Sequence, residues 1–293
     1  MKIMVYEARP DEQADLEKQA ALHGVELSVT DAVPTLENAS LAAGCAGVSI
    51  LGQGRIDAAL LDAYHALGVR YLSTRTIGYD HIDLDHAQSI GLRVCSASYA
   101  PNGVADFTVM MILMCLRHYK QALWRGQVND FSLTGLQGRE MKDLTIGIIG
   151  TGRIGAQVVR NLSGFGCRIL AYDLRRNPAV ESQVTYVDFD TLLAQSDVIT
   201  LHMPLLDSNR HIINREAIAK MRDGVVIVNC SRGELADIEA LIEGIETGKI
   251  GALGMDTVEG DEGIIHADHR VDILPNRNWF YLHQFRNVIM TQH

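Results

Sequence analysis

The chain has 293 residues, of which 47% are hydrophobic and 21% charged, with a formal net charge of −10 and a pI near 5.5. This length allows one large domain or two of ordinary size, each with its own core. The acidic balance disfavours a nucleic-acid or anionic-membrane surface, because both attract basic proteins. It does not exclude a small anionic substrate held in a locally basic pocket.

Cysteine usage and the apolar runs indicate the compartment. The five cysteines are Cys45, Cys95, Cys115, Cys167 and Cys230. They are odd in number and widely spaced, so reduced thiols fit better than a disulfide framework. The longest apolar run, Val109 to Leu116, is too short to span a bilayer, and the first residues resemble a strand more than a signal peptide. We therefore expect a soluble, cytoplasmic protein.

The first hundred residues alternate between two kinds of segment. Short β-rich runs predict strands at 2–7, 26–30, 47–52, 70–75 and 93–97. Helical patterns occupy 11–22 and 56–67. Strands that alternate with helices of this length predict βαβ units and a parallel sheet.

A long helix is predicted next, from Gly103 to Gln127. Its first half is apolar nearly all round, which indicates burial between domains or at a subunit contact, and we expect Val109–Leu116 to form a dimer surface. A second alternating series follows, with strands predicted at 144–150, 168–173, 198–202, 225–230 and 250–256. The prediction is an α/β protein of two domains, 1–100 and 101–293, both with parallel sheets.

The most specific motif is TIGIIGTGRIG, at 145–155. An apolar strand runs into Gly150-x-Gly152-x-x-Gly155, and a helical pattern follows. These glycines allow a tight turn, a close approach to a pyrophosphate and close helix packing, while the helix N-terminus supplies oriented N–H groups. The predicted cofactor-binding loop comprises Gly150, Gly152, Arg153, Ile154 and Gly155.

Asp173 ends the next predicted strand, roughly 20 residues after the first glycine, where a ribose-binding acid is expected. A carboxylate there accepts from a ribose 2′-OH and repels a 2′-phosphate, so NAD is favoured over NADP. Arg175 and Arg176 follow and could hold such a phosphate. We interpret them mainly as a solvated surface pair, because the aspartate comes first.

Further motifs follow in a family-like order. They are YLSTRTIGYDHID, SYAPNGVADFTVMMIL, SDVITLHMPL, VNCSRGELAD, GALGMDTVEGDEG and NVIMTQH. With the glycine motif they resemble the D-isomer-specific 2-hydroxyacid dehydrogenases, most closely the D-lactate dehydrogenases, including the vancomycin-resistance type. The resemblance implies a flavodoxin-like substrate domain, a Rossmann NAD-binding domain and an active site between them. It also implies a chain segment that returns to the first domain after the catalytic histidine, and we expect that segment to be missing because the sequence stops at His293.

Reduction of a 2-oxo acid needs a cation for the carboxylate, a proton donor and a hydride source. Arg232 follows a buried-looking strand and matches the family's substrate-binding arginine; a guanidinium can make paired hydrogen bonds to a carboxylate. His293 matches the acid/base histidine, and histidine titrates near neutrality. Gln292 stands where proline is common in this motif, which removes no chemical group.

The third catalytic group is a carboxylate that supports the histidine. The resemblance places Asp261 at the position of the family's glutamate, with Glu262 and Glu259 as neighbours in an acidic loop. Asp is one methylene shorter than Glu, so either the backbone lies closer or Glu262 turns inward. We favour Asp261, and Glu262 remains the alternative.

The resemblance also implies the rest of the site. Substrate-binding residues would be Ile77, Gly78, Tyr99 and Arg232, with Thr76 where asparagine is frequent. The nicotinamide half of NAD would meet His202, Pro204, Cys230 and Asp256. A satisfied core histidine is the alternative for His202.

Other interpretations carry less weight. His266 and His269 could suggest a metal pair, but H-x-x-H without a third ligand is weak evidence, and we expect no metal. The expected function is an NAD-dependent D-2-hydroxyacid dehydrogenase acting on pyruvate or a bulkier 2-oxo acid, as a homodimer. The alternatives are an NAD(H)-sensing regulatory protein on the same scaffold, or a truncated inactive chain, because fold alone does not decide function.

Overall fold

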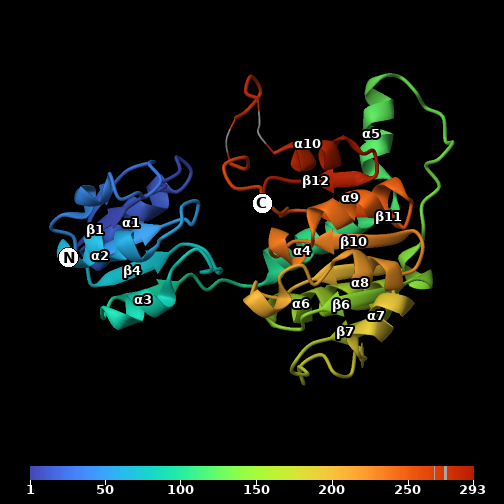
Figure 1. Cartoon of the computed structure of the whole chain (residues 1–293), viewed down its shortest axis with the longest axis horizontal. Coiled ribbons are helices and arrows are strands. Elements are labelled where there is room, and N and C mark those ends of the chain that lie inside the picture. The colour runs from blue at the N-terminus through green and yellow to red at the C-terminus, as the bar shows by residue number, and fades with distance from the viewer. Residues whose placement is uncertain (267, 274–275) are drawn as a thin grey trace. The chain divides into compact units, whose positions relative to one another are not determined.

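The computed structural model describes residues 1–266, 268–273 and 276–293. The chain forms two compact units, Met1–Tyr99 and Ala100–His293 (Figure 1). Within the described residues, no helix is both long and apolar enough to cross a membrane.

The first unit contains a five-stranded parallel sheet in the order β2-β1-β3-β4-β5. Its strands are β1 Lys2–Val5, β2 Glu26–Val29, β3 Gly47–Ile50, β4 Tyr71–Thr74 and β5 Arg93–Ser96. Its helices are α1 Gln13–His23, α2 Ala58–Ala66 and α3 Leu84–Ser89. This strand order is that of flavodoxin-like folds, so the predicted fold of the N-terminal part is confirmed.

The second unit is built on seven parallel strands in the order β12-β11-β10-β9-β6-β7-β8. The strands are β6 Thr145–Ile149, β7 Arg168–Tyr172, β8 Thr185–Tyr186, β9 Val198–Leu201, β10 Val225–Asn229, β11 Ile250–Met255 and β12 Val288–Met290. The helices are α4 Asn102–Leu116, α5 Tyr119–Gln127, α6 Arg153–Leu162, α7 Phe189–Gln195, α8 Arg215–Lys220, α9 Ile238–Glu246 and α10 Arg277–Gln284. The order reverses between β6 and β9, as in the Rossmann fold, which confirms that prediction.

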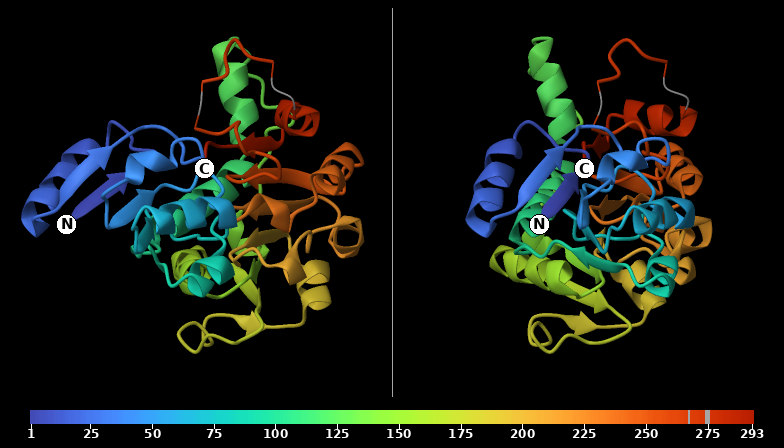
Figure 2. Two further views of the ribbon diagram at one scale, coloured as in Figure 1. Left: turned by 60° about the vertical axis from the view of Figure 1, so that its left-hand side comes forward. Right: turned by 90° about the vertical axis from the view of Figure 1, so that its left-hand side faces the viewer.

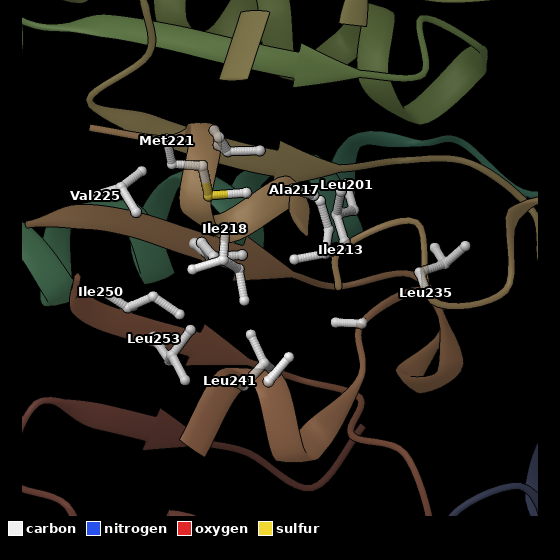
Figure 3. Packing of buried hydrophobic residues seen from close by; sticks show 14 of the residues in the cluster. Leu201, Ile213, Ala217, Ile218, Met221, Val225, Leu235, Leu241, Ile250 and Leu253 are labelled. Carbon is white, nitrogen blue, oxygen red and sulfur yellow. The ribbon is translucent and has the colours of Figure 1, made fainter. Parts of the chain in front are cut away.

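Both faces of this sheet are covered, which explains why its central strands are apolar throughout. Ile148 points into a cluster with residues of α4 and α6, while its neighbour Ile149 points into a second cluster on the opposite face. That second cluster includes Ile218 of α8 and Leu241 of α9, which pack together over the strands (Figure 3). Helices thus pack on both faces of the sheet, and the carboxyl ends of its parallel strands lie along one edge.

The predicted helix from Gly103 to Gln127 is two helices. The chain breaks between α4 and α5 at His118, whose φ is 51° in the left-handed region. The returning segment competes for the end of α4: the Arg139 N–H donates to the Leu116 carbonyl at 3.1 Å, and His118 Nε2 donates to the Gln137 carbonyl at 3.1 Å. The first contact satisfies a carbonyl at the end of α4 that would otherwise accept the next helical N–H, and the second fixes the His118 side chain against the returning segment.

The expected dimer surface at Val109–Leu116 is also wrong for most of its residues. Val109, Met111, Ile112, Cys115 and Leu116 are buried inside the second unit, where α4 packs on α6 and β10. The apolar face of α4 is therefore already covered within one subunit. Exposed apolar side chains lie instead on α5, which stands away from the sheet of this unit, and on the segment after it (Figure 2).

Candidate active site

The predicted site residues of the second unit share one location: each follows the carboxyl end of a parallel strand. These residues are Gly150 after β6, Asp173 after β7, His202 after β9, Cys230 and Arg232 after β10, Asp256 after β11 and His293 after β12. In open α/β sheets, ligands bind outside these ends, near the point where strand order reverses. Six strands therefore bring distant sequence positions to one edge.

The glycine turn between β6 and α6 allows close backbone approach. Gly150 has φ 92°, and a Cβ there would lie 2.7 Å from the His202 carbonyl oxygen. A Cβ on Gly155 would lie 2.0 Å from the Gly150 carbonyl oxygen, so the helix can approach this turn only with glycine at 155. A Cβ on Gly152 would meet no atom within 4 Å, and Gly152 is the N-cap of α6.

This geometry fits a pyrophosphate. Open space above Gly152 lies next to the first turn of α6, which begins with Arg153 and Ile154. The first N–H groups of a helix have no intrahelical partner, and its dipole favours negative charge at that end. These residues would hold the phosphates of a dinucleotide.

Asp173 is oriented by three donors from the protein. The Thr151 N–H and hydroxyl donate to Asp173 Oδ2 at 2.6 and 3.0 Å, and the Arg175 N–H donates to Oδ1 at 3.0 Å. A carboxylate has about four acceptor positions, so one remains on Oδ1. This arrangement fits a ribose hydroxyl better than a phosphate, because the carboxylate can only accept.

Two side chains expected at the nicotinamide end, His202 and Cys230, are neutral. Burial lowers the pKa of His202 to about 3 and raises the pKa of Cys230 to about 12. His202 Nε2 lies 3.1 Å from the Thr200 hydroxyl, while Nδ1 is buried without a hydrogen-bond partner among the described residues. Within the described residues His202 is therefore not fully hydrogen-bonded, as a satisfied core histidine would be. Pro204 is exposed beyond β9.

The loop that carries Arg232 is shaped by a buried asparagine. Asn229 is 0% exposed; its Nδ2 donates to the Arg232 carbonyl at 2.7 Å, and its Oδ1 accepts from the Ser231 N–H at 3.1 Å. Gly233, which follows Arg232, is packed so closely that a Cβ there would lie 2.3 Å from the Val258 carbonyl carbon. The turn is thus fixed on both sides of Arg232, which is partly buried.

The backbone of His293 is hydrogen-bonded to the Asp256 carboxylate. The His293 N–H donates to Asp256 Oδ1 at 3.2 Å, and the Thr291 hydroxyl donates to the same oxygen at 2.6 Å. The Thr291 N–H also donates to the Met255 carbonyl at 3.0 Å. These bonds fix the turn after β12 against the end of β11.

The three carboxylates of the acidic loop have different surroundings. Glu259 Oε1 lies 2.6 Å from His211 Nε2 and 3.4 Å from Arg210 Nη1, so it is already paired. Glu262 is exposed, whereas Asp261 is partly buried and accepts from the Val258 N–H at 3.1 Å. Of the three, Asp261 has the surroundings expected for a supporting carboxylate.

Electrostatics link these groups. His293 is an exposed residue, yet desolvation of its ring by neighbouring protein lowers its pKa, and the charges of Arg232 and His266 act in the same direction. Asp256 and Asp261 oppose this by favouring the imidazolium. Burial in turn raises the pKa of Asp261, which the nearby His293 charge lowers. His293 therefore lies within electrostatic range of both Arg232 and Asp261.

The predicted substrate loop of the first unit lies beyond β4. Ile77 and Gly78 are partly buried there, and the Thr76 hydroxyl donates to the Gly78 carbonyl at 2.7 Å. Arg75 anchors the loop by donating to the carbonyls of residues 6 and 7 at 3.0 and 2.9 Å. Tyr99, the last residue of this unit, is 50% exposed.

The two histidines of the H-x-x-H segment have other contacts. His266 Nε2 lies 3.2 Å from the His293 carbonyl oxygen, and His269 Nδ1 lies 2.9 Å from Asp272 Oδ2. Ala267, between them, is outside the described residues. In the part of the chain that the structure describes, no three His, Cys, Asp or Glu side chains are grouped as metal ligands.

Sequence reasoning missed the residues that orient these groups. Asn229 shapes the Arg232 turn, Thr291 bonds Asp256, and Thr151 bonds Asp173. Each stands inside a motif already singled out, but its role depends on which side chain the fold brings near it. A polar residue at the end of an otherwise apolar strand was the available signal.

A parallel sheet with a glycine turn, an oriented acid and a cation next to a histidine defines an NAD-dependent oxidoreductase. Comparison with known families is more specific. Residues 109–293 match the model of the D-isomer specific 2-hydroxyacid dehydrogenase NAD binding domain. The chain belongs to this family, and the predictions of an NAD-dependent dehydrogenase and of NAD as cofactor are confirmed.

Relatives match over the full length of the chain. The aromatic 2-oxoacid reductase of Clostridium sporogenes is 40% identical, over 100% of this chain and 89% of its own. The structure of the pyruvate reductase of Chlamydomonas reinhardtii is 35% identical with a TM-score of 0.89, covering 100% and 89%. An NAD-complexed D-isomer specific 2-hydroxyacid dehydrogenase from Lactobacillus delbrueckii is 31% identical with a TM-score of 0.82, covering 100% and 90%.

Proposed function

We propose that the chain reduces a 2-oxo acid to the D-2-hydroxy acid, with Arg232, Asp261 and His293 as the catalytic residues. The observation that supports the proposal is that His293, after β12, lies within electrostatic range of Arg232, after β10, and of Asp261, in the loop after β11. The D configuration follows from the family. The glycine turn lies at the same edge of the sheet, so the proposed catalytic and cofactor residues all follow the carboxyl ends of its strands.

Each residue has a chemical task. When bound, NADH supplies the hydride. The Arg232 guanidinium holds the substrate carboxylate and polarises the ketone, because it can donate two parallel hydrogen bonds. Protonated His293 donates an N–H proton to the substrate oxygen, and the Asp261 carboxylate stabilises the imidazolium. Asp256 accepts from the nicotinamide carboxamide, and Asp173 accepts from the adenosine ribose.

The first unit supplies the remaining substrate contacts in this proposal. We assign the substrate domain to residues 1–100 and the NAD-binding domain to 101–293. Main-chain N–H groups of Ile77 and Gly78 bind the carboxylate, since oriented amides attract anions. Tyr99 lines the substrate site at the end of this unit.

The size of the side-chain pocket separates pyruvate from bulkier acids. Relatives include an aromatic 2-oxoacid reductase and a pyruvate reductase, so both classes are candidates. The test measures NADH consumption with pyruvate, 4-methyl-2-oxopentanoate and phenylpyruvate, and identifies the product enantiomer by chiral chromatography. The substrate with the highest kcat/KM defines the pocket, and an L product would contradict the proposal.

The residue roles are tested by matched variants. His293→Gln is expected to lose reduction by about two to four orders of magnitude, as for a general acid, with the NADH Kd nearly unchanged. His86→Gln is the control: this histidine pairs with Asp62 at 2.8 Å, outside the proposed chemistry, and the variant keeps most activity. NADH binding without turnover in the unmodified chain would fit both alternatives, the NAD(H)-sensing protein and the inactive chain.

We also propose a cytoplasmic homodimer. The unpaired thiols fit a reducing compartment. Trp124 of α5 is 63% exposed, and Phe131 and Leu133 beyond it are 78% and 83% exposed. Large apolar side chains exposed together mark interaction sites, and we propose a second copy of the chain as the partner. Light scattering should give a dimer, which Trp124→Glu with Phe131→Glu converts to monomer; a monomeric parent chain would refute this.

A further inference from the structure

Tyr186 is connected to the cofactor-selecting carboxylate by a chain of hydrogen bonds. Its hydroxyl donates to Thr151 Oγ1 at 2.9 Å, and Thr151 Oγ1 donates to Asp173 Oδ2 at 3.0 Å. The Asn177 N–H donates to the Tyr186 oxygen at 2.9 Å, and Asn177 Nδ2 donates to the Thr151 carbonyl at 2.7 Å. Tyr186 lies on β8, the edge strand of the sheet, and is partly buried.

The direction of every bond in this chain is fixed. An ionised carboxylate can only accept, so Thr151 must give its single hydroxyl proton to Asp173. Thr151 Oγ1 can then only accept, and the proton it accepts comes from Tyr186. The Asn177 N–H can only donate, so the tyrosine oxygen serves it as acceptor. All protons therefore point toward Asp173, and bonds aligned in this way strengthen one another.

The same tyrosine holds a cation on its ring. The Arg176 guanidinium carbon lies 5.6 Å from the Tyr186 ring centroid, and Arg176 Nη1 lies 3.9 Å from Glu181 Oε1. A guanidinium over an aromatic face is attracted by the ring quadrupole. Arg176 is a cation that could bind a ribose 2′-phosphate, and here it is held against the ring and a carboxylate.

We infer that Tyr186 is a positioning residue for cofactor choice: its hydroxyl orients Asp173 through Thr151, and its ring holds Arg176 away from a 2′-phosphate. The two ends of one side chain thus act on the two groups that discriminate NADH from NADPH. The inference rests on the ribose-binding role proposed for Asp173. Its basis is the chain of hydrogen bonds and the position of Arg176 over the ring, which the family assignment alone does not specify.

Two substitutions separate the two contributions. Tyr186→Phe removes the hydroxyl and keeps the ring, so the NADH Kd should rise about three- to tenfold, the worth of one hydrogen bond, while the NADPH Kd stays constant. Tyr186→Leu removes both, so NADH should weaken similarly and NADPH should bind at least about threefold tighter. Adding Arg176→Ala to Tyr186→Leu should abolish that gain.

The readout is the Kd of each dinucleotide from fluorescence titration, with thermal melting to confirm the fold and kcat to confirm unchanged chemistry. Tyr281→Phe is the matched control, because its hydroxyl bonds Glu246 at 2.7 Å and both residues are far in the sequence from Asp173. Thr151→Val should weaken NADH binding as Tyr186→Phe does. The double variant should bind NADH no more weakly than either single variant, because both substitutions interrupt the same chain of hydrogen bonds. Additive losses would overturn the inference and indicate separate structural roles.

The remaining outcomes are distinguishable. If Asp173→Asn leaves the ratio of NADH to NADPH affinity unchanged, the proposed role of Asp173 is wrong, and the inference falls with it. If Asp173→Asn changes the ratio but Tyr186→Phe leaves both Kd values at those of the parent chain, Asp173 keeps its role and the inference about Tyr186 alone is overturned.

Discussion

Lys120 of α5 forms hydrogen bonds with the segment that precedes His293. Its substitution tests how much these bonds stabilise the second unit. Its ammonium donates to the carbonyls of His283, Phe285 and Val288 at 2.8, 2.9 and 2.8 Å. These carbonyls lie at the end of α10, in the turn after it and at the start of β12. Carbonyls at the end of a helix have no intrahelical partner, so the ammonium supplies a donor to the end of α10 and connects it with the start of β12.

Lys120→Met keeps the length of the side chain and removes all three bonds. A hydrogen bond to a charged group contributes about 1.5–3 kcal/mol, but burial opposes the ammonium, as the lowered pKa of Lys120 shows. Water can also reach the carbonyls in the variant, since Lys120 is only partly buried. We take about 1 kcal/mol for each carbonyl, or about 3 kcal/mol in total.

The assay is thermal unfolding, followed in the transition that NADH raises, because a ligand stabilises the unit that binds it. A loss of about 3 kcal/mol should lower Tm by roughly 6–12 °C in a domain of this size. Lys220→Met is the control: this lysine bonds Asp190 at 2.8 and 2.9 Å on the surface, and such a pair contributes at most about 1 kcal/mol. Equal Tm changes in both variants would refute the reasoning.

The remaining predictions concern the site. Gly155→Ala places a Cβ 2.0 Å from a carbonyl oxygen, so it should destabilise the unit by about 1–3 kcal/mol or more and weaken NADH binding by at least about tenfold in the same titration. Burial raises the pKa of Cys230 to about 12, so mass spectrometry should find it unlabelled by iodoacetamide at pH 8 until the protein unfolds. In the proposed mechanism reduction needs protonated His293, so activity is lost as pH rises through the His293 pKa. Asp261→Asn removes a charge that raises this pKa, so the alkaline limb of kcat/KM should move to lower pH. Glu262→Gln makes the same charge change on an exposed neighbour and should leave that limb nearly in place.

The sequence was informative where the chemistry is local. The glycine turn could be predicted because its three glycines, the strand before it and the helix after it lie within about twenty residues, the scale of one βαβ unit. Parallel strands could be predicted because apolar runs alternate with helices. In the structure Gly150 and Gly155 are indeed the positions where a side chain would collide with backbone.

The break between α4 and α5 could not be predicted in this way. His118 has no helix-breaking chemistry of its own, and the chain around it has a helical pattern. The competing partners, Gln137 and Arg139, are about twenty residues later and reach the end of α4 only after the chain has turned back. Tertiary contacts of this kind override local propensity, and the pattern alone gives no position for them.

The acidic loop shows the same limit at the level of single side chains. Glu259 and Asp261 stand on either side of Gly260, whose φ is 76°, and their side chains have different partners. Glu259 is bound by His211, almost fifty residues earlier, and that partner removes it from the candidates for supporting His293. Adjacent carboxylates have the same chemistry in the sequence, and only their distant partners differ. The assignment of a catalytic carboxylate therefore depends less on its own motif than on which of its neighbours the fold has already paired.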